Sequence, residues 1–241
     1  MSYAIYHIAM ITTIVSGASE NHAKSLIAFL ESMTTTTSTV KLYVWDFGLS
    51  VGSRRYIEEH FEKANVFLRT FDFSKYPGYF DIRVAAGQYA WKPAAIWETA
   101  LEIREGVLLW CDAGNRLNGP MEPLCATIEK QGVYSPISAG TVRRWTHPGT
   151  VAYMHVHESM LEMSPRNGAI IGFNLSNIHA WDVLGDWYRL AQIQDCIAPE
   201  GSDRSNHRQD QAILTVLYYQ FMNGLIGEDQ YISMLTHCDI D

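Results

Sequence analysis

An aspartate stands directly after an apolar run in the middle of the chain. Residues 107–114 read Val-Leu-Leu-Trp-Cys-Asp-Ala-Gly, so a segment of strand-like length ends at Asp112 and is followed by two small residues. Ligands collect at the edge of an open α/β sheet where its strands end, and the small residues Ala113 and Gly114 leave room for a ligand or a metal ion to approach the Asp112 oxygens. The alternative is an aspartate that only caps a turn.

A second carboxylate lies near the end of the chain, on the apolar face of an expected helix. Residues 208–222 place apolar side chains along one face, namely Ile213, Leu214, Leu217, Tyr218 and Phe221. Asp210 precedes the first two of these by three and four residues, so it belongs to the same inward face. Asn206 and Gln209 have the spacing of a capping box. A carboxylate on that face is costly unless it is paired, hydrogen-bonded or bound to a ligand.

The elements that must position these acids alternate between strand and helix. Strand-like runs recur at residues 3–15, 40–45, 66–71, 107–110, 133–137 and 169–173, and the clearest helices between them are 20–33 and 93–103. Pro93 suits the first turn of the second helix, which puts Lys92 at a helix N-terminus. The alternation predicts an α/β fold with a central, mainly parallel sheet flanked by helices. Without an internal repeat or a long linker, we expect one domain over residues 1–241.

Composition narrows the class of protein. The 47% of hydrophobic residues excludes a disordered chain, and 13 Tyr and 7 Trp suit the stacking of sugars and bases. A net charge of −8 argues against a nonspecific nucleic-acid binder. The four cysteines form no Cys-x-x-Cys pair, so we expect reduced thiols and a cytoplasmic location. The apolar run 4–15 is too short to span a membrane. No glycine-rich dinucleotide or P-loop motif occurs.

Five short motifs follow one another in an order that resembles a known family. They are Thr12-Thr13, Trp45-Asp46-Phe47-Gly48-Leu49-Ser50, Trp91-Lys92-Pro93, Cys111-Asp112-Ala113-Gly114 and His207-Arg208-Gln209-Asp210-Gln211. This order resembles the nucleotide-diphospho-sugar transferases of the GT-A fold. Within them it is similar to a group with a Tyr-Asp-Leu-Gly-Leu-Ser-type second strand, a Lys-Pro helix, a Trp-x-Asp-Ala-Gly strand end and a His-Arg-x-Asp-Gln helix start.

The resemblance implies a site for the nucleotide of a sugar donor. The end of the first strand and the acid after the second would hold the base and the ribose, and these positions are Thr12, Thr13 and Asp46. A carboxylate suits a base N–H or a ribose hydroxyl. Lys92 would meet a phosphate, helped by the helix dipole. The alternatives are a turn cap for Asp46 and an ordinary solvated side chain for Lys92.

The resemblance also implies a divalent cation at Asp112. Mn²⁺ or Mg²⁺ prefers oxygen ligands and neutralises a leaving nucleotide diphosphate. The sequence departs from the usual Asp-x-Asp, because the third position is Gly114, and this puts metal dependence in doubt. His237 would be the second ligand, with Asn115 as a further candidate. A histidine so near the end of a chain is otherwise a surface residue.

Asp210 is the acid that the resemblance places on the acceptor side. It would act as general base on an acceptor hydroxyl in an inverting reaction, or bind acceptor hydroxyls in a retaining one. The alternative is an acid that accepts backbone N–H bonds at its own helix start. His207, Arg208 and Gln211 would contact the acceptor or a phosphate.

The function implied is the transfer of a sugar from a nucleotide-diphosphate sugar to a hydroxyl of a glycan or another acceptor. Two other functions stay open. One is a noncatalytic nucleotide-sugar-binding module, motivated by the missing acid at Gly114. The other is a nucleotide-sugar hydrolase that uses the same Asp112 pocket on water.

Overall fold

A six-stranded sheet forms the centre of the chain. The computed structural model describes residues 12–35, 40–62, 64–222 and 230–240. Its sheet has the order β3-β2-β1-β4-β7-β6, in which the first four strands are parallel, β7 is antiparallel to β4, and β6 is antiparallel to β7. The strands are β1 (Thr12–Ala18), β2 (Lys41–Asp46), β3 (Val66–Thr70), β4 (Val107–Cys111), β6 (Val133–Tyr134) and β7 (Ile170–Asn174). The predicted α/β fold with a mainly parallel sheet is confirmed.

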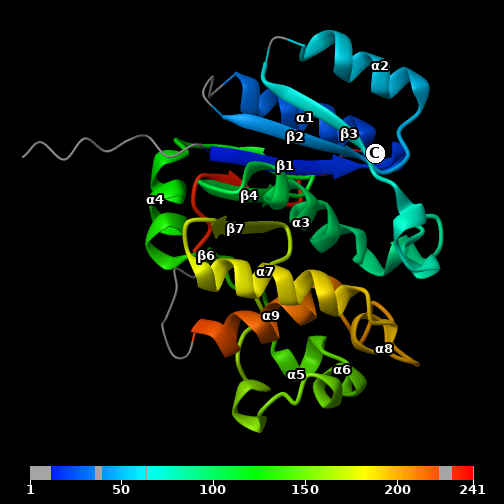
Figure 1. Cartoon of the computed structure of the whole chain (residues 1–241), viewed down its shortest axis with the longest axis vertical. Coiled ribbons are helices and arrows are strands. Elements are labelled where there is room, and N and C mark those ends of the chain that lie inside the picture. Colours follow the sequence, from blue (N-terminus) through cyan, green and yellow to red (C-terminus); the bar gives the residue numbers. More distant parts are fainter. Residues whose placement is uncertain (1–11, 36–39, 63, 223–229, 241) are drawn as a thin grey trace, which may run out of the picture.

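Helices cover both faces of the sheet (Figure 1). Strand residues alternate between two cores: Ile14, Val44 and Leu109 face α1, α2 and α4, whereas Val15 and Trp110 face α3, α7 and α9. The longer helices are α1 (Ala23–Thr34), α2 (Val51–His60), α3 (Trp91–Ile103), α4 (Glu122–Gln131), α7 (Ile178–Ala191) and α9 (Gln209–Met222). None of the helices in the described ranges is long and apolar enough to cross a membrane.

Shorter elements complete the fold. Turns of 3-10 helix occur at η1 (Glu20–His22), η2 (Phe73–Lys75), η3 (Gly78–Phe80), η4 (Ala85–Tyr89) and η5 (Glu158–Met160). The short helices are α5 (Val142–Trp145), α6 (Pro148–Tyr153) and α8 (Gln194–Ile197), and β5 (Arg116–Leu117) pairs with β8 (Met234–Leu235). The expected helix 20–33 therefore begins as 3-10 turn, and the expected strand 133–137 is shortened to β6.

The first strand ends later than predicted. The expected strand 3–15 lies outside the described residues up to residue 11, and β1 continues to Ala18. Ser16 and Gly17 look like turn residues, but they pair with Val44 and Trp45 of β2. A Cβ at position 17 would lie 2.5 Å from both the Phe47 ring and the Trp45 carbonyl oxygen, so the sheet requires glycine there.

The carboxyl ends of β1, β2, β3 and β4 meet at one edge of the sheet. Asp46 is the last residue of β2, and Asp112 directly follows β4, on either side of β1. The loops that leave these strands therefore converge where ligands bind in open α/β sheets.

Candidate active site

A lysine bridges two aspartates at this edge. The Lys92 Nζ lies 3.0 Å from Asp112 Oδ1 and 3.3 Å from Asp210 Oδ2, and it donates a hydrogen bond of 3.0 Å to the Gly168 carbonyl oxygen. The side chains of Lys92 and Asp210 are each 6% exposed, whereas that of Asp112 is 38% exposed. The cluster thus has two buried members and one acid that faces open space.

Three elements bring the cluster together. Lys92 lies in the first turn of α3, Asp112 follows β4, and Asp210 is in the first turn of α9. Two tryptophans fix the acids: Trp110 Nε1 donates to Asp112 Oδ1 at 2.6 Å, and Trp187 Nε1 donates to the Asp210 carbonyl oxygen at 2.8 Å. The first of these bonds is local, because Trp110 stands two residues before Asp112, whereas the second joins α7 to the start of α9.

Burial sets the protonation of the cluster. Burial alone would lower the pKa of Lys92, but the charges of Asp112 and Asp210 outweigh it, so the pKa of Lys92 is raised and its ammonium is retained. Burial raises the pKa of Asp210, and Lys92 offsets only part of that effect. Asp210 Oδ2 is near the ammonium without a hydrogen bond of good angle. The Asp210 carboxylate is therefore only partly stabilised, and its affinity for a proton is increased, which is a property that suits a general base.

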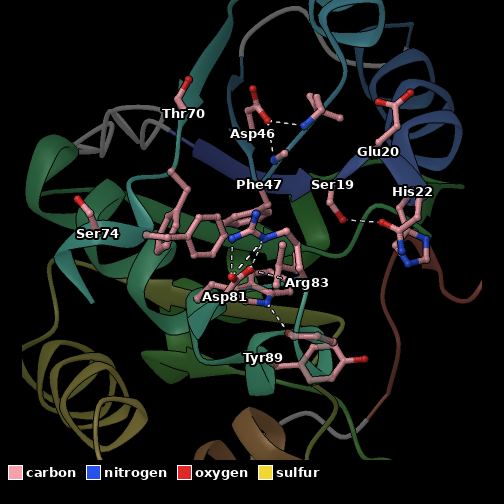
Figure 2. A pocket seen from close by; sticks show the side chains of 18 of the residues that line it. Ser19, Glu20, His22, Asp46, Phe47, Thr70, Ser74, Asp81, Arg83 and Tyr89 are labelled. Carbon is pink, nitrogen blue, oxygen red and sulfur yellow. Dashed lines mark hydrogen bonds and ion pairs between the residues drawn. The ribbon is translucent and has the colours of Figure 1, made fainter. Parts of the chain in front are cut away.

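Three adjoining cavities run along the sheet edge. The aromatic cavity, about 930 Å³ in volume, is lined by Phe47, Phe71, Tyr89 and Trp91 and by the polar residues around Ser19 (Figure 2). The central cavity of about 330 Å³ shares Ser19, Phe47, Tyr89 and Trp91 with it.

The third space, the Asp210 cavity, has a volume of about 320 Å³. Lys92, Asp112 and His237 line both it and the central cavity, while Asp210, Arg208 and Gln211 belong to it alone. The three cavities thus form one groove that is aromatic at one end and charged at the other.

A left-handed turn forms one wall of this groove. Residues 85–89 of η4 all have positive φ, from +47° at Ala85 to +59° at Gly87, although only one of them is glycine. Tyr89, which ends this turn, lines all three cavities. Trp91 Nε1 donates to the Ala86 carbonyl oxygen at 2.9 Å and so helps to hold the turn. Strained backbone of this kind clusters at binding sites.

The structure brings together most of the polar site residues predicted from the sequence. Asp112, Asp210, Arg208, Gln211 and His237 all line the Asp210 cavity. Their individual roles stay predictions. Among the lining residues that the sequence reading missed are Tyr89, Arg204 and Asp239. Only their closeness in sequence to the motifs could have indicated them, because Tyr89 stands two residues before Trp91 and Arg204 stands three before His207.

Thr12 and Thr13 require a correction. They begin the described part of β1 rather than ending the strand, so they lie at the amino edge of the sheet. Thr13 is fully buried, and the Thr12 hydroxyl lies 3.4 Å from Cys125 Sγ. Ser19, directly after β1, lines the aromatic cavity in their place.

Lys92 and Asp46 have structural contacts that were not expected for donor-binding groups. Lys92 is neither solvated nor free to bind a phosphate, because its ammonium is occupied by the two acids. Asp46 Oδ1 accepts the Gly48 and Leu49 N–H groups at 2.8 and 2.6 Å, and its Oδ2 pairs with Arg54 at 2.9 Å. Asp46 is therefore a turn cap that also lines the aromatic cavity.

The predicted capping box is wrong. The Asn206 side chain accepts from the Asp203 N–H instead of capping α9. Arg143, Arg144 and Trp145 form the short helix α5. The bond from Asp203 N to Asn206 lies within the loop before α9. The end of this loop is joined to α5, because Arg208 N donates to the Trp145 carbonyl oxygen at 3.0 Å.

His207 also requires a correction, because it is fully buried and lines none of the three cavities. Its Nδ1 accepts the His147 N–H at 3.2 Å, and its Nε2 lies 3.0 Å from the Ile197 carbonyl oxygen, to which the neutral ring donates. Burial lowers the pKa of His207 to about 4. The imidazole therefore joins the loops before α6 and α9 instead of contacting an acceptor.

We expect His207 to make folding stability depend on pH. Its folded-state pKa of about 4 lies below the ordinary 6.5, so the unfolded chain binds the proton more tightly. Stability should fall as the pH is lowered from about 6.5 towards 4, by up to about 3 kcal/mol. Urea unfolding across this range should show that the free energy of unfolding depends less on pH in His207→Gln than in the wild type. The exposed His179→Gln should keep the wild-type dependence, and parallel curves for all three proteins would contradict the prediction.

A divalent cation would find separate ligands here, because Asp112, His237 and Asp239 line the central cavity without being grouped around one point. Asp112 Oδ1 is already engaged by Lys92 and Trp110. At the third position of the motif, a Cβ on Gly114 would lie 2.5 Å from Asp239 Oδ1, so the Asp239 carboxylate takes the room of a second acid. Within the described part of the chain, no three His, Cys, Asp or Glu side chains are grouped to hold a metal. Dependence on Mn²⁺ or Mg²⁺ stays a prediction against which this donor set argues.

Comparison with known proteins finds the fold but no close relative. No family model and no curated protein matches the chain. A crystal structure of the galactosyltransferase LgtC with donor and acceptor sugar analogues is similar, with a TM-score of 0.56 and 16% identity, over 94% of this chain and 87% of that chain.

Two further glycosyltransferases are similar over part of their length. The bifunctional glycosyltransferase WbbM has a TM-score of 0.57 and 13% identity over 89% of this chain and 38% of its own. The glycosyltransferase GlyE of Streptococcus pneumoniae has a TM-score of 0.51 and 12% identity over 87% of this chain and 43% of its own. This chain therefore has the GT-A fold found in glycosyltransferases.

Proposed function

We propose that the chain is a glycosyltransferase that moves a sugar from a nucleotide-diphosphate sugar to a hydroxyl of a glycan or another acceptor. The observation that carries the proposal is the Lys92-bridged pair Asp112 and Asp210, which opens into a groove with an aromatic end. Fold likeness supports the proposal, but function must come from the site.

The groove offers a place for each part of the two substrates. Phe47, Tyr89 and Trp91 supply ring surface on which a base can stack in the aromatic cavity. The diphosphate would then lie in the central cavity, and the sugar and the acceptor would meet in the Asp210 cavity. Asp112, with its partly exposed side chain, would accept hydrogen bonds from hydroxyl groups of the donor sugar.

The chemistry rests on positioning and on charge. The acceptor oxygen attacks the anomeric carbon, the bond from that carbon to the diphosphate oxygen breaks, and the electron pair leaves with the diphosphate. In an inverting reaction Asp210 takes the acceptor proton, whereas in a retaining reaction it holds the acceptor hydroxyl while the departing diphosphate oxygen takes that proton. Lys92 orients both acids in either case, and it contributes through preorganisation rather than by touching substrate.

A panel of nucleotide sugars tests the proposal. One of them should raise the melting temperature of the full chain, because a ligand that binds only the folded state stabilises it. Asp112→Asn should weaken binding of that donor about 10- to 100-fold, which is what losing a hydrogen bond to a charged group costs. Asp186→Asn, on the solvent side of α7, is the matched control and should bind as the wild type does.

Product analysis separates the transferase from its two alternatives. Nucleoside diphosphate should be released much faster when an acceptor is present than when it is absent. Release of free sugar at the same rate without acceptor would indicate a hydrolase, and donor binding without any turnover would indicate a binding module. No melting shift with any nucleotide sugar would contradict the proposal outright.

A further inference from the structure

Three arginines gather beside the Asp210 cavity without a carboxylate partner. Arg208 Cζ lies 4.0 Å and Arg144 Cζ 4.9 Å from the centre of the Trp145 ring, so this ring is shared by two guanidinium groups. Arg204 Cζ lies 5.0 Å from the Tyr89 ring, and its Nη1 donates to the Tyr89 hydroxyl. Among the described residues, no Asp or Glu lies within 4.0 Å of these three guanidinium groups.

This arrangement is unusual for the arginines of this chain. Arginines on other surfaces pair with acids, namely Arg54, Arg55, Arg69, Arg83, Arg143 and Arg189. Arg143 is the direct neighbour of Arg144, and it pairs with both Glu158 and Glu162. Arg104 and Arg116 instead donate to backbone carbonyl oxygens. Acids are plentiful in a chain with a net charge of −8, so three neighbouring arginines with no acid beside them among the described residues indicate a site for an anion from outside.

The three guanidinium groups also act on one another. Burial lowers the pKa of Arg208 first, and the positive charges of Arg204 and Arg144 lower it further. Like charges held this close repel, and an anion between them would relieve the repulsion. The aromatic rings supply only part of the stabilisation, because a cation over a ring face carries no neutralising charge.

The position of two of these arginines selects the anion. Arg204 lines the central cavity and the Asp210 cavity, and Arg208 lines the Asp210 cavity. Lys92 cannot serve, since the carboxylates of Asp112 and Asp210 exceed its single charge. An anionic group lying between the aromatic cavity and Asp210 would meet Arg204 first and Arg208 next. In a nucleotide-sugar donor that group is the diphosphate.

We propose that Arg204 and Arg208 bind the diphosphate of the donor and stabilise it as the leaving group, so that donor binding does not require a divalent cation. The inference rests on the proposed function. When the bond between the anomeric carbon and the diphosphate oxygen breaks, the electron pair stays on that oxygen, and guanidinium N–H groups donate to the charge that develops there. A planar guanidinium matches two phosphate oxygens at once.

Calorimetric titration of the full chain with nucleoside diphosphates, in buffer with EDTA, tests the inference. The preferred nucleoside diphosphate should bind the wild type under these conditions. Arg204→Gln and Arg208→Gln should each weaken it about 10- to 100-fold, and affinity should fall with salt. The corresponding nucleoside, which has no phosphate, should bind the wild type and Arg208→Gln alike, because Arg208 does not line the aromatic cavity. Arg204 also contacts Tyr89, so for Arg204→Gln the loss of nucleoside diphosphate affinity should exceed any loss of nucleoside affinity.

Two further variants control for charge and for folding. Arg143→Gln, on the same short helix as Arg144 but paired with two glutamates, should bind as the wild type does. Arg208→Lys keeps a cation beside Trp145 and should give an intermediate affinity. Circular dichroism confirms that each variant folds before it is titrated.

Each result decides the inference. Binding that is lost in EDTA and restored by Mn²⁺ would overturn it, as would unchanged affinity in Arg204→Gln and Arg208→Gln. A wild type that binds neither nucleoside diphosphates nor nucleotide sugars, with or without Mn²⁺, would contradict the proposed function itself. Variants that lose affinity for the nucleoside diphosphate but keep affinity for the nucleoside would support the inference.

Discussion

Replacement of Lys92 by methionine should destabilise the folded chain by about 3–5 kcal/mol, which is the loss found when one partner of a buried ion pair is removed. Methionine has a similar length, so the volume is kept while the ammonium is lost. Asp112 and Asp210 would then repel each other, and the Gly168 carbonyl oxygen would lose its donor. Urea unfolding at neutral pH measures the difference.

A second substitution should recover much of that loss. Asp210→Asn in the Lys92→Met background removes one of the two uncompensated charges, so the double variant should be more stable than Lys92→Met alone. The exposed Lys75→Met is the control and should stay within about 0.5 kcal/mol of the wild type. A destabilisation below about 1 kcal/mol for Lys92→Met would show that the bridge does not hold the acids.

Asp210→Asn in the wild-type background should lower the transfer rate about 100- to 10,000-fold, the usual contribution of a general base. The same change should leave stability unchanged or increase it. Burial raises the pKa of Asp210 above 3.8, so the stability that this carboxyl contributes is present below that pH and is lost as the pH rises through its folded-state pKa. A neutral amide avoids that loss, and Lys92 keeps Asp112 as its partner.

Three measurements separate a catalytic acid from a structural one at position 210. Donor binding by Asp210→Asn should match the wild type, its melting temperature should not fall, and only transfer should be lost. Asp186→Asn is again the control, with wild-type values for all three. Retained transfer in Asp210→Asn would show that Asp210 has only a structural role, and so would a large fall in melting temperature.

Much of the fold could be predicted because its physical causes are local. The apolar runs at β2, β4 and β7 are most stable in a buried sheet, and Asp112 marks the point where one of them ends. Asp210 was placed on an inward face by helical spacing alone, and it is buried in the structure. Both acids therefore carried a signal that the sequence displays directly.

The features that could not be predicted depend on contacts between distant segments. Ser16 and Gly17 continue β1 only because β2 pairs with them. His207 is buried because the loop that carries His147 and the end of α8 at Ile197 close over it. The left-handed turn at residues 85–89 has no glycine-rich signature, and helix-forming residues such as Ala85 and Gln88 hold their positive φ only because the surrounding structure requires it.

The bridging lysine has a consequence for how this chain can change over evolutionary time. Lys92, Asp112 and Asp210 lie in three separate elements, and the single ammonium holds the two carboxylates together. Loss of the lysine leaves two carboxylates facing each other, whereas loss of one acid leaves the lysine paired with the other. Among descendants of this chain, we therefore expect position 92 to tolerate change least of the three, however freely the surface around it diverges.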